Sequence, residues 1–170
     1  TLEANVLAAI QLQVEAALDY DKLLDKLRGS EGEKNIRDQQ NALITSLNLR
    51  LNGVSKKRTR LYEDYAEGLL DEAEYSFAKK SYDEQYADLS RRLDEAVQRR
   101  SKFDEAMSVD NKWITLMKSV STATQLSQDL VDESVELVKV HEGGAVELVM
   151  KYGDIYELTI QSIKEVQEAM

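Results

Sequence analysis

Apolar residues recur every three or four positions along the first segment of the chain, residues 2 to 27. The side chains that share this face are Leu2, Val6, Ile10, Val14, Ala17 and Leu18. This spacing predicts an amphipathic helix whose apolar face is directed at a core. Gly29 is typical of the position just after a helix, and Ser30 followed by Glu33 has the spacing of a capping box. A second helix is therefore expected to start at once.

The longest patterned stretch runs without proline from about Ser30 to Met107 and is broken once, at residues 67–71. Before the break, the apolar positions are Ile36, Leu43, Leu47, Leu51, Val54, Leu61 and Tyr65. After the break, one row of apolar residues with seven-residue spacing contains Tyr75, Tyr82, Leu89, Ala96 and Phe103. A second row beside it contains Tyr86, Leu93 and Met107. These patterns predict two long antiparallel helices that form a coiled-coil arm of roughly 50 Å.

Two smaller signals lie within this stretch. Asp71 and Glu74 repeat the capping pattern at the start of the return helix. Gly53 interrupts the apolar stripe of the first helix and should weaken that helix by about 1 kcal/mol relative to alanine, without breaking it.

The pattern changes after Met107. Asp110 is expected to cap a short helix that bears Trp113, Ile114, Leu116 and Met117, and Ser127 opens another that contains Leu130, Val131 and Val135. Alternating residues over 137–141 and 146–152, around Gly143-Gly144, predict a β-hairpin. A two-stranded hairpin is marginal in water, so it should lie on helices or complete a larger sheet. Ile160, Ile163, Val166 and Met170 indicate a final helix.

The predicted fold is therefore mainly α: a long antiparallel coiled-coil hairpin on a small helical base with one short β-hairpin. The expected segments are a base helix over 1–29, the arm over 30–107, returning helices and the β-hairpin over 108–152, and a C-terminal helix or tail over 153–170.

Composition narrows the setting. The chain is 42% hydrophobic and 32% charged, and no segment reaches the 18 or so consecutive apolar residues that a spanning helix needs. The first residues also lack the basic and then apolar pattern of a signal peptide. A soluble, cytoplasmic protein without membrane contact is expected.

Few residues are suited to chemistry. The absence of cysteine excludes disulfides, thiolate catalysis and cysteine-ligated zinc within these residues. The one histidine, His141, stands beside the predicted hairpin turn and is expected to be solvated. Adjacent carboxylates such as Asp83 and Glu84 diverge by about 100° around a helix, which favours solvated faces over an acid/base pair. No nucleophile with a base and no glycine-rich phosphate loop is found, so we expect a protein that is not an enzyme and has no cofactor or small-molecule substrate.

The net charge of −10 has the wrong sign for a nucleic-acid clamp, but one basic cluster stands out. It contains Arg50, Lys56, Lys57, Arg58 and Arg60, with no acidic residue among them. Such a cluster could contact a DNA backbone or an acidic partner. The other interpretation is a solubilising face that pairs with acids across the hairpin. The latter is favoured by the acidic residues at a comparable distance from the turn, Glu72, Glu74, Asp83, Glu84 and Asp88.

The turn itself is the sharper candidate. Leu69 and Leu70, flanked by Tyr65, lie where the rod ends and where little protein remains to cover them. One interpretation is an apolar tip that docks a partner. The other is a plug, with both leucines folded inward to close the hairpin. The sequence leaves the two open.

The run Leu61-Tyr62-Glu63-Asp64-Tyr65-Ala66-Glu67-Gly68-Leu69-Leu70-Asp71-Glu72-Ala73-Glu74-Tyr75 resembles the coiled-coil turn of large serine recombinases. The downstream order strengthens the resemblance: a helix with Trp113-Ile114, then residues 126–131, then 138–142, similar to the helix and strand that return the chain to the body in those proteins. Asp71 stands where serine or threonine is usual, and all three residues cap helices. The resemblance covers residues 1 to about 152.

The resemblance implies a parent protein with a serine-nucleophile catalytic domain, a DNA-binding recombinase domain and a zinc ribbon from which the arm projects. The resemblance also implies that the arm mediates contacts between subunits, for synapsis and for the direction of DNA integration or excision. The parent would bind zinc through cysteines and DNA through separate domains, and this sequence contains neither. No catalytic or metal-binding residue therefore carries over to it. The implied partners are other recombinase subunits and a directionality factor, in a bacterial, nucleoid-associated setting. The alternative is a free-standing cytoplasmic helical adaptor or scaffold protein.

Overall fold

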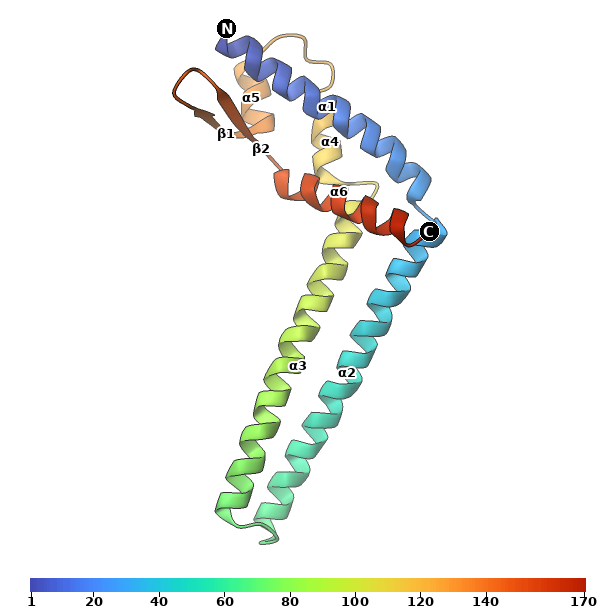
Figure 1. Cartoon of the computed structure of the whole chain (residues 1–170), viewed down its shortest axis with the longest axis vertical. Coiled ribbons are helices and arrows are strands. Elements are labelled where there is room, and N and C mark those ends of the chain that lie inside the picture. The colour runs from blue at the N-terminus through green and yellow to red at the C-terminus, as the bar shows by residue number, and fades with distance from the viewer. The chain divides into compact units, whose positions relative to one another are not determined.

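The computed structural model describes all 170 residues and is 76% helical. In chain order the elements are α1 (Leu2–Leu27), α2 (Glu31–Ala66), α3 (Glu72–Met107), α4 (Lys112–Ser119), α5 (Gln128–Ser134), β1 (Val135–Val140), β2 (Val146–Met150) and α6 (Gly153–Glu168). Figure 1 shows α2 and α3 running antiparallel beside each other. The predicted fold class, a long helical hairpin with a small helical base and one β-hairpin, is confirmed. None of the helices combines the length and apolar character needed to cross a membrane.

The chain divides into two compact units. The base unit comprises residues 1–36 and 102–170, and the arm unit comprises residues 37–101. The arm expected over 30–107 is therefore longer than the arm unit, because residues 30–36 and 102–107 belong to the base unit. Asn35 donates from Nδ2 to the carbonyl oxygen of Ala169 at 3.0 Å, and Met107 is buried in the core of the base.

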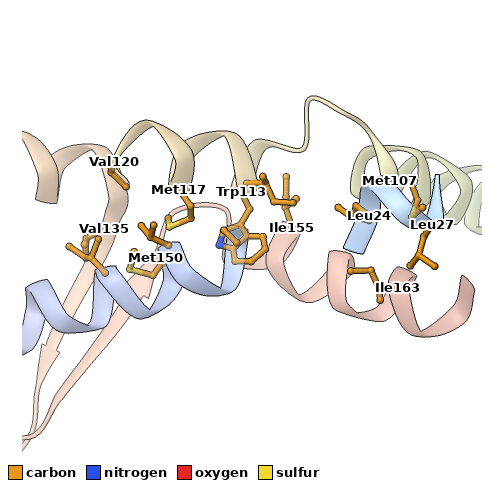
Figure 2. Packing of buried hydrophobic residues seen from close by; sticks show 14 of the residues in the cluster. Leu24, Leu27, Met107, Trp113, Met117, Val120, Val135, Met150, Ile155 and Ile163 are labelled. Atoms are coloured by element: carbon orange, nitrogen blue, oxygen red, sulfur yellow. The ribbon is translucent and has the colours of Figure 1, made fainter. Parts of the chain in front are cut away.

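Trp113 of α4 is the centre of the core of the base unit and is fully buried. Its ring lies 6.1 Å from that of Tyr20 and 4.7 Å from that of Tyr156, centroid to centroid. Figure 2 shows the neighbouring side chains of Met117, Met150 and Ile155. Residues from α1, α4, β2 and α6, far apart in sequence, thus share one apolar core.

The apolar face predicted for α1 is confirmed at four of its six positions, Val6, Ile10, Val14 and Ala17, which are all buried. The prediction is wrong for Leu2 and Leu18, which are 51% and 38% exposed. Leu2 lies in the first turn, and Leu18 lies 100° around the helix from the fully buried Ala17. The stripe therefore runs along the Ala17 side and leaves Leu18 at its edge.

Asn111, not the expected Asp110, caps α4. Its Oδ1 accepts from the backbone N–H of Ile114 at 3.1 Å. Its Nδ2 donates to the carbonyl oxygen of Ala106 at 2.9 Å and to Oγ1 of Thr159 at 2.8 Å. The site is buried, and a carboxylate has no hydrogen to donate, so an amide satisfies this position where aspartate could not.

The β-hairpin forms around Gly143 and Gly144, whose φ angles are +93° and +85°. Val135, expected in the preceding helix, is instead the first residue of β1, and a bulge follows it. The second strand ends at Met150, two residues before the predicted end, since the backbone turns into the left-handed region at Tyr152. One face of the hairpin packs on the core of the base through Val138, Val146 and Leu148.

The arm unit has a small core of its own. Its buried residues are Leu47 and Val54 from α2 and Leu89 and Ala96 from α3. The second row of α3 is partly buried against this core through Tyr86 and Leu93, and α2 continues through Gly53 without a break, as expected. Leu43 and Tyr65 are the exceptions to the predicted stripe, at 47% and 36% exposed.

Candidate functional site

The turn of the arm is fixed by its own backbone. At the end of α2 the N–H groups of Gly68 and Leu69 donate to the carbonyl oxygens of Tyr65 and Asp64, at 3.0 and 2.9 Å. With Gly68 at φ +78°, this is a Schellman motif, in which glycine adopts a conformation that other residues rarely take. Such a turn holds its side chains in defined positions.

The predicted capping box at the start of α3 is confirmed. Oδ1 of Asp71 accepts from the N–H of Glu74 at 2.8 Å, and the N–H of Asp71 donates to the carboxylate of Glu74 at 3.0 Å. Two backbone groups that the helix leaves without partners are thereby satisfied. Both sides of the turn, the end of α2 and the start of α3, are thus locally specified.

Tyr65 closes the end of the hairpin. Its ring stacks on that of Tyr75, with centroids 4.3 Å apart and planes 14° from parallel. The stack joins α2 to α3 one turn of helix before the chain reverses. Tyr65 remains 36% exposed, so its outer edge is still available at the surface.

The two leucines of the turn differ, and no single interpretation fits both. Leu70 is half-buried, whereas Leu69 is 67% exposed. In a Schellman motif the residue after the glycine usually makes an apolar contact with the residues four or five before the glycine. Those positions hold Asp64 and Glu63 here, so Leu69 lacks an apolar neighbour of that kind.

Phe77 is an exposed aromatic residue near the turn that the apolar pattern did not single out. It is 82% exposed, the most exposed large apolar side chain in the chain. Phe77 follows Tyr75 by two residues, which places it about 200° around α3 from the seam, the row of Tyr75, Tyr82 and Leu89 that faces α2. A helical wheel centred on the seam would have identified it.

The basic cluster divides into two parts. Arg58 faces α3, where its Nη2 lies 2.9 Å from Oδ1 of Asp83 and its guanidinium carbon lies 4.6 Å from the centre of the Tyr86 ring. The contact between Arg58 and Asp83 is an ion pair without the alignment of a hydrogen bond. The interpretation of pairing across the hairpin therefore holds for Arg58.

The other four members of the cluster, Arg50, Lys56, Lys57 and Arg60, are exposed and make no ion pair. Residues of a helix advance by about 100° each, so these four occupy one sector of α2 of about 120°. That sector is turned away from the side on which Arg58 meets α3. These four side chains are free to contact another molecule.

The charge of the chain is unevenly distributed between the units. Residues 37–101 contain twelve basic and twelve acidic residues, so the arm unit is neutral. The remaining ten basic and twenty acidic residues place the whole net charge of −10 on the base unit. The arm is therefore the part of the chain that an anionic surface repels least.

Asp83 gives a pH dependence that can be measured. A hydrogen bond from Lys79, at 2.6 Å, and the charges of Lys79 and Arg58 lower the pKa of Asp83. A carboxyl group with a lowered pKa stabilises the fold above its unfolded pKa, and this contribution is lost as the pH falls through the folded pKa. We expect Asp83→Asn to lower the melting temperature of the arm helices at pH 6 and to have a smaller effect at about pH 2, below the ordinary pKa of 3.8, because this contribution is lost as the carboxyl group takes up a proton.

Thermal melts followed by circular dichroism at both pH values test this expectation. Asp94→Asn is the matched control, because Asp94 lies on the exposed side of α3 and makes no ion pair. A loss for Asp83→Asn that is equal at both pH values would show that the charge of Asp83 does not matter. The effect should be small, because the pair is partly exposed.

His141 lies at the surface of the β-hairpin, as expected. Its Nε2 is 3.1 Å from the carboxylate of Glu147, whose pKa is lowered by a hydrogen bond from Lys139 and by one from His141. No group of three or more histidine, aspartate and glutamate side chains is arranged to hold a metal ion.

Comparisons with protein-family models, with curated proteins and with solved structures found no match for this chain.

Proposed function

We propose that this chain is the non-catalytic C-terminal interaction module of a serine site-specific DNA recombinase, and that its arm mediates contacts between subunits for synapsis and direction. The observation that carries the proposal is the exposed Leu69 at the rigid turn of a hairpin whose closure is provided by the Tyr65–Tyr75 stack. The turn lies within the run, residues 61–75, that resembles the arms of those recombinases. Other copies of the arm and a directionality factor are the proposed partners.

The exposure of Leu69 supports association because it is not needed to close the hairpin. The backbone of the turn holds the side chain of Leu69 at 67% exposure. Covering this apolar surface with a partner lowers the free energy and so favours association. Leu70 is half-buried instead. Of the two interpretations of the leucines, docking thus suits Leu69 and closure suits Leu70.

Leu69→Asp should therefore reduce self-association of the chain while leaving its melting temperature almost unchanged. Leu70→Asp should lower the melting temperature of the arm helices, because it places a charge at a half-buried position. Sedimentation velocity and thermal melts of both variants separate these effects. Leu12→Asp is the matched control, since Leu12 is 66% exposed but lies on α1 in the base unit.

Equal effects of Leu69→Asp and Leu12→Asp on association would refute a specific role for the turn. Self-association that is indifferent to Leu69→Asp would locate the contact elsewhere on the chain. In both cases the melting temperature shows whether the variant is folded.

The second candidate is a free-standing helical adaptor whose arm spaces two partners. The coding sequence around this chain separates the two proposals. The recombinase proposal expects an upstream region that encodes a serine-nucleophile domain and paired cysteines. An open reading frame that starts at or near this segment would favour the adaptor.

A further inference from the structure

The exposed sector of α2 carries its charges in two blocks. Arg50, Lys56, Lys57 and Arg60 are followed, on the same sector, by Glu63, Asp64 and Glu67. At about 100° per residue, all seven fall within roughly 140° of the helix surface, turned away from α3. We call this surface, residues 50–67 on the side of α2 opposite the seam, the charged stripe. Its basic half comes first and its acidic half lies next to the turn.

A surface with this order is complementary to itself when turned end to end. We infer that the charged stripes of two copies pair antiparallel about a two-fold axis near Leu61–Tyr62, so that the basic half of each copy faces the acidic half of the other. Arg60 of one copy then lies opposite Glu63 of its partner, and Lys56 opposite Glu67. Because the arrangement is two-fold, each of these contacts is made twice.

The dimensions of the stripe suit this arrangement. Lys56 and Glu67 are eleven residues apart, which is about 17 Å along the helix. Side chains at this spacing on two antiparallel helices meet in register, as charged positions do beside the seams of coiled coils. The four basic side chains make no ion pair within their own chain, so no existing contact is lost when they pair.

Exposed apolar side chains lie at both ends of the stripe. Leu69 follows the acidic half, and Leu49, which is 68% exposed, precedes the basic half on the same sector of α2. With the axis near Leu61–Tyr62, Leu69 of one copy lies opposite position 54 of the other, roughly 7.5 Å along the helix from Leu49. Gly53, between Leu49 and Lys56, has nothing within 4 Å of the position where a Cβ would stand, so the partner can approach closely there.

The distribution of charge favours a second copy, antiparallel, over other occupants. The arm unit is neutral, while each base unit carries a net charge of −10 and is joined to the ends of α2 and α3 remote from the turn. Parallel pairing would set like halves of the stripe against each other. Antiparallel pairing opposes unlike halves and keeps the covalently attached acidic units at opposite ends.

This inference rests on the proposed function, since it specifies how one arm would meet another. Charge pairs at a wet surface contribute modest affinity and much of the specificity, and salt screens them. Self-association of the chain should therefore weaken as the ionic strength rises.

The test exchanges the charges of the two halves. One double variant is Lys56→Glu/Arg60→Glu and the other is Glu63→Lys/Glu67→Lys, both at exposed positions. Each alone sets like charges against each other, so each should self-associate at least about tenfold more weakly than the unmodified chain. An equimolar mixture of the two opposes unlike charges at every contact and should associate again. Sedimentation equilibrium of the single and mixed samples measures this.

A fourth sample separates loss of folding from loss of contact. A chain with all four substitutions has its two halves exchanged, so it should self-associate like the unmodified chain, which a misfolded variant would not do. Failure of both the mixture and the fourfold variant to associate would overturn the inference. Association of the unmodified chain that neither double variant changes would also overturn it, but would leave the proposed function standing. Absence of self-association in the unmodified chain would refute the proposed arm contacts themselves.

Discussion

Asn111→Ala should lower the free energy of unfolding of the base unit by about 3 kcal/mol, the larger of two strong stability effects that we expect. The substitution removes the cap of α4, which accepts from Ile114, and two donated bonds, to Ala106 and Thr159. A lost cap costs about 1 kcal/mol, and each buried polar group left without a partner costs about 1 to 3 kcal/mol. The single tryptophan, Trp113, is buried two residues away and reports unfolding of this unit by fluorescence in urea.

Two further variants sharpen this prediction. Asn111→Ser retains an oxygen that can cap α4 but cannot make both donated bonds, so it should fall between the wild type and alanine. Asn52→Ala, at an exposed position of α2, should change the stability of the base unit by less than about 0.5 kcal/mol. A loss below about 1 kcal/mol for Asn111→Ala would contradict the role given to this side chain.

Gly32→Ala should destabilise the base unit by about 2 kcal/mol, although alanine favours helices over glycine. A Cβ at Gly32 would stand 2.2 Å from the backbone oxygen of Val166 and 2.6 Å from Cγ of Met170. The side chain of Met170 can move aside, but the backbone of α6 must shift as a whole. The gain in helix propensity, about 1 kcal/mol, is smaller than the cost of that shift.

Gly53→Ala is the matched control and should have the opposite sign. Gly53 lies in the middle of α2, and a Cβ there would meet nothing within 4 Å. The arm unit should become more stable by about 1 kcal/mol. Urea denaturation followed by Trp113 fluorescence for the base and by circular dichroism for the arm measures the pair. Stabilisation by both substitutions would show that α2 and α6 do not approach as closely as described.

Local patterns were sufficient to predict the elements of this fold. The row with seven-residue spacing through Tyr75, Tyr82 and Leu89 predicted the seam of α3, and the spacing of Asp71 and Glu74 predicted its first turn. Both signals depend on residues a few positions apart, so they can be recognised without knowledge of the rest of the chain. The Gly143-Gly144 turn was predictable for the same reason.

Contacts between distant segments could not be predicted in this way. The sequence predicts Asp110 as the cap because it does not show that Oγ1 of Thr159, in another helix, accepts a hydrogen bond from Asn111. Gly32 carries no local signal of its own, since only the approach of α6 makes a side chain impossible there. The local pattern predicts a helix at Val135, because the partner that makes it a strand residue, Met150, lies fifteen residues further along the chain.

The candidate site was predicted in part. Leu69, Leu70 and Tyr65 were identified from their position at the turn, but their different roles depend on the Schellman geometry and on the stack with Tyr75. The basic cluster was identified as a block, whereas its division depends on which side of α2 each residue occupies. Arg58 faces α3, and the other four residues do not.

Sedimentation equilibrium of the unmodified chain, over a range of loading concentrations at low and at physiological salt, tests the central claim most directly. If the arm mediates contacts between subunits, the apparent mass should rise with concentration from 19.3 kDa toward twice that value, and more so at low salt. An apparent mass that stays at 19.3 kDa under all these conditions would contradict the account.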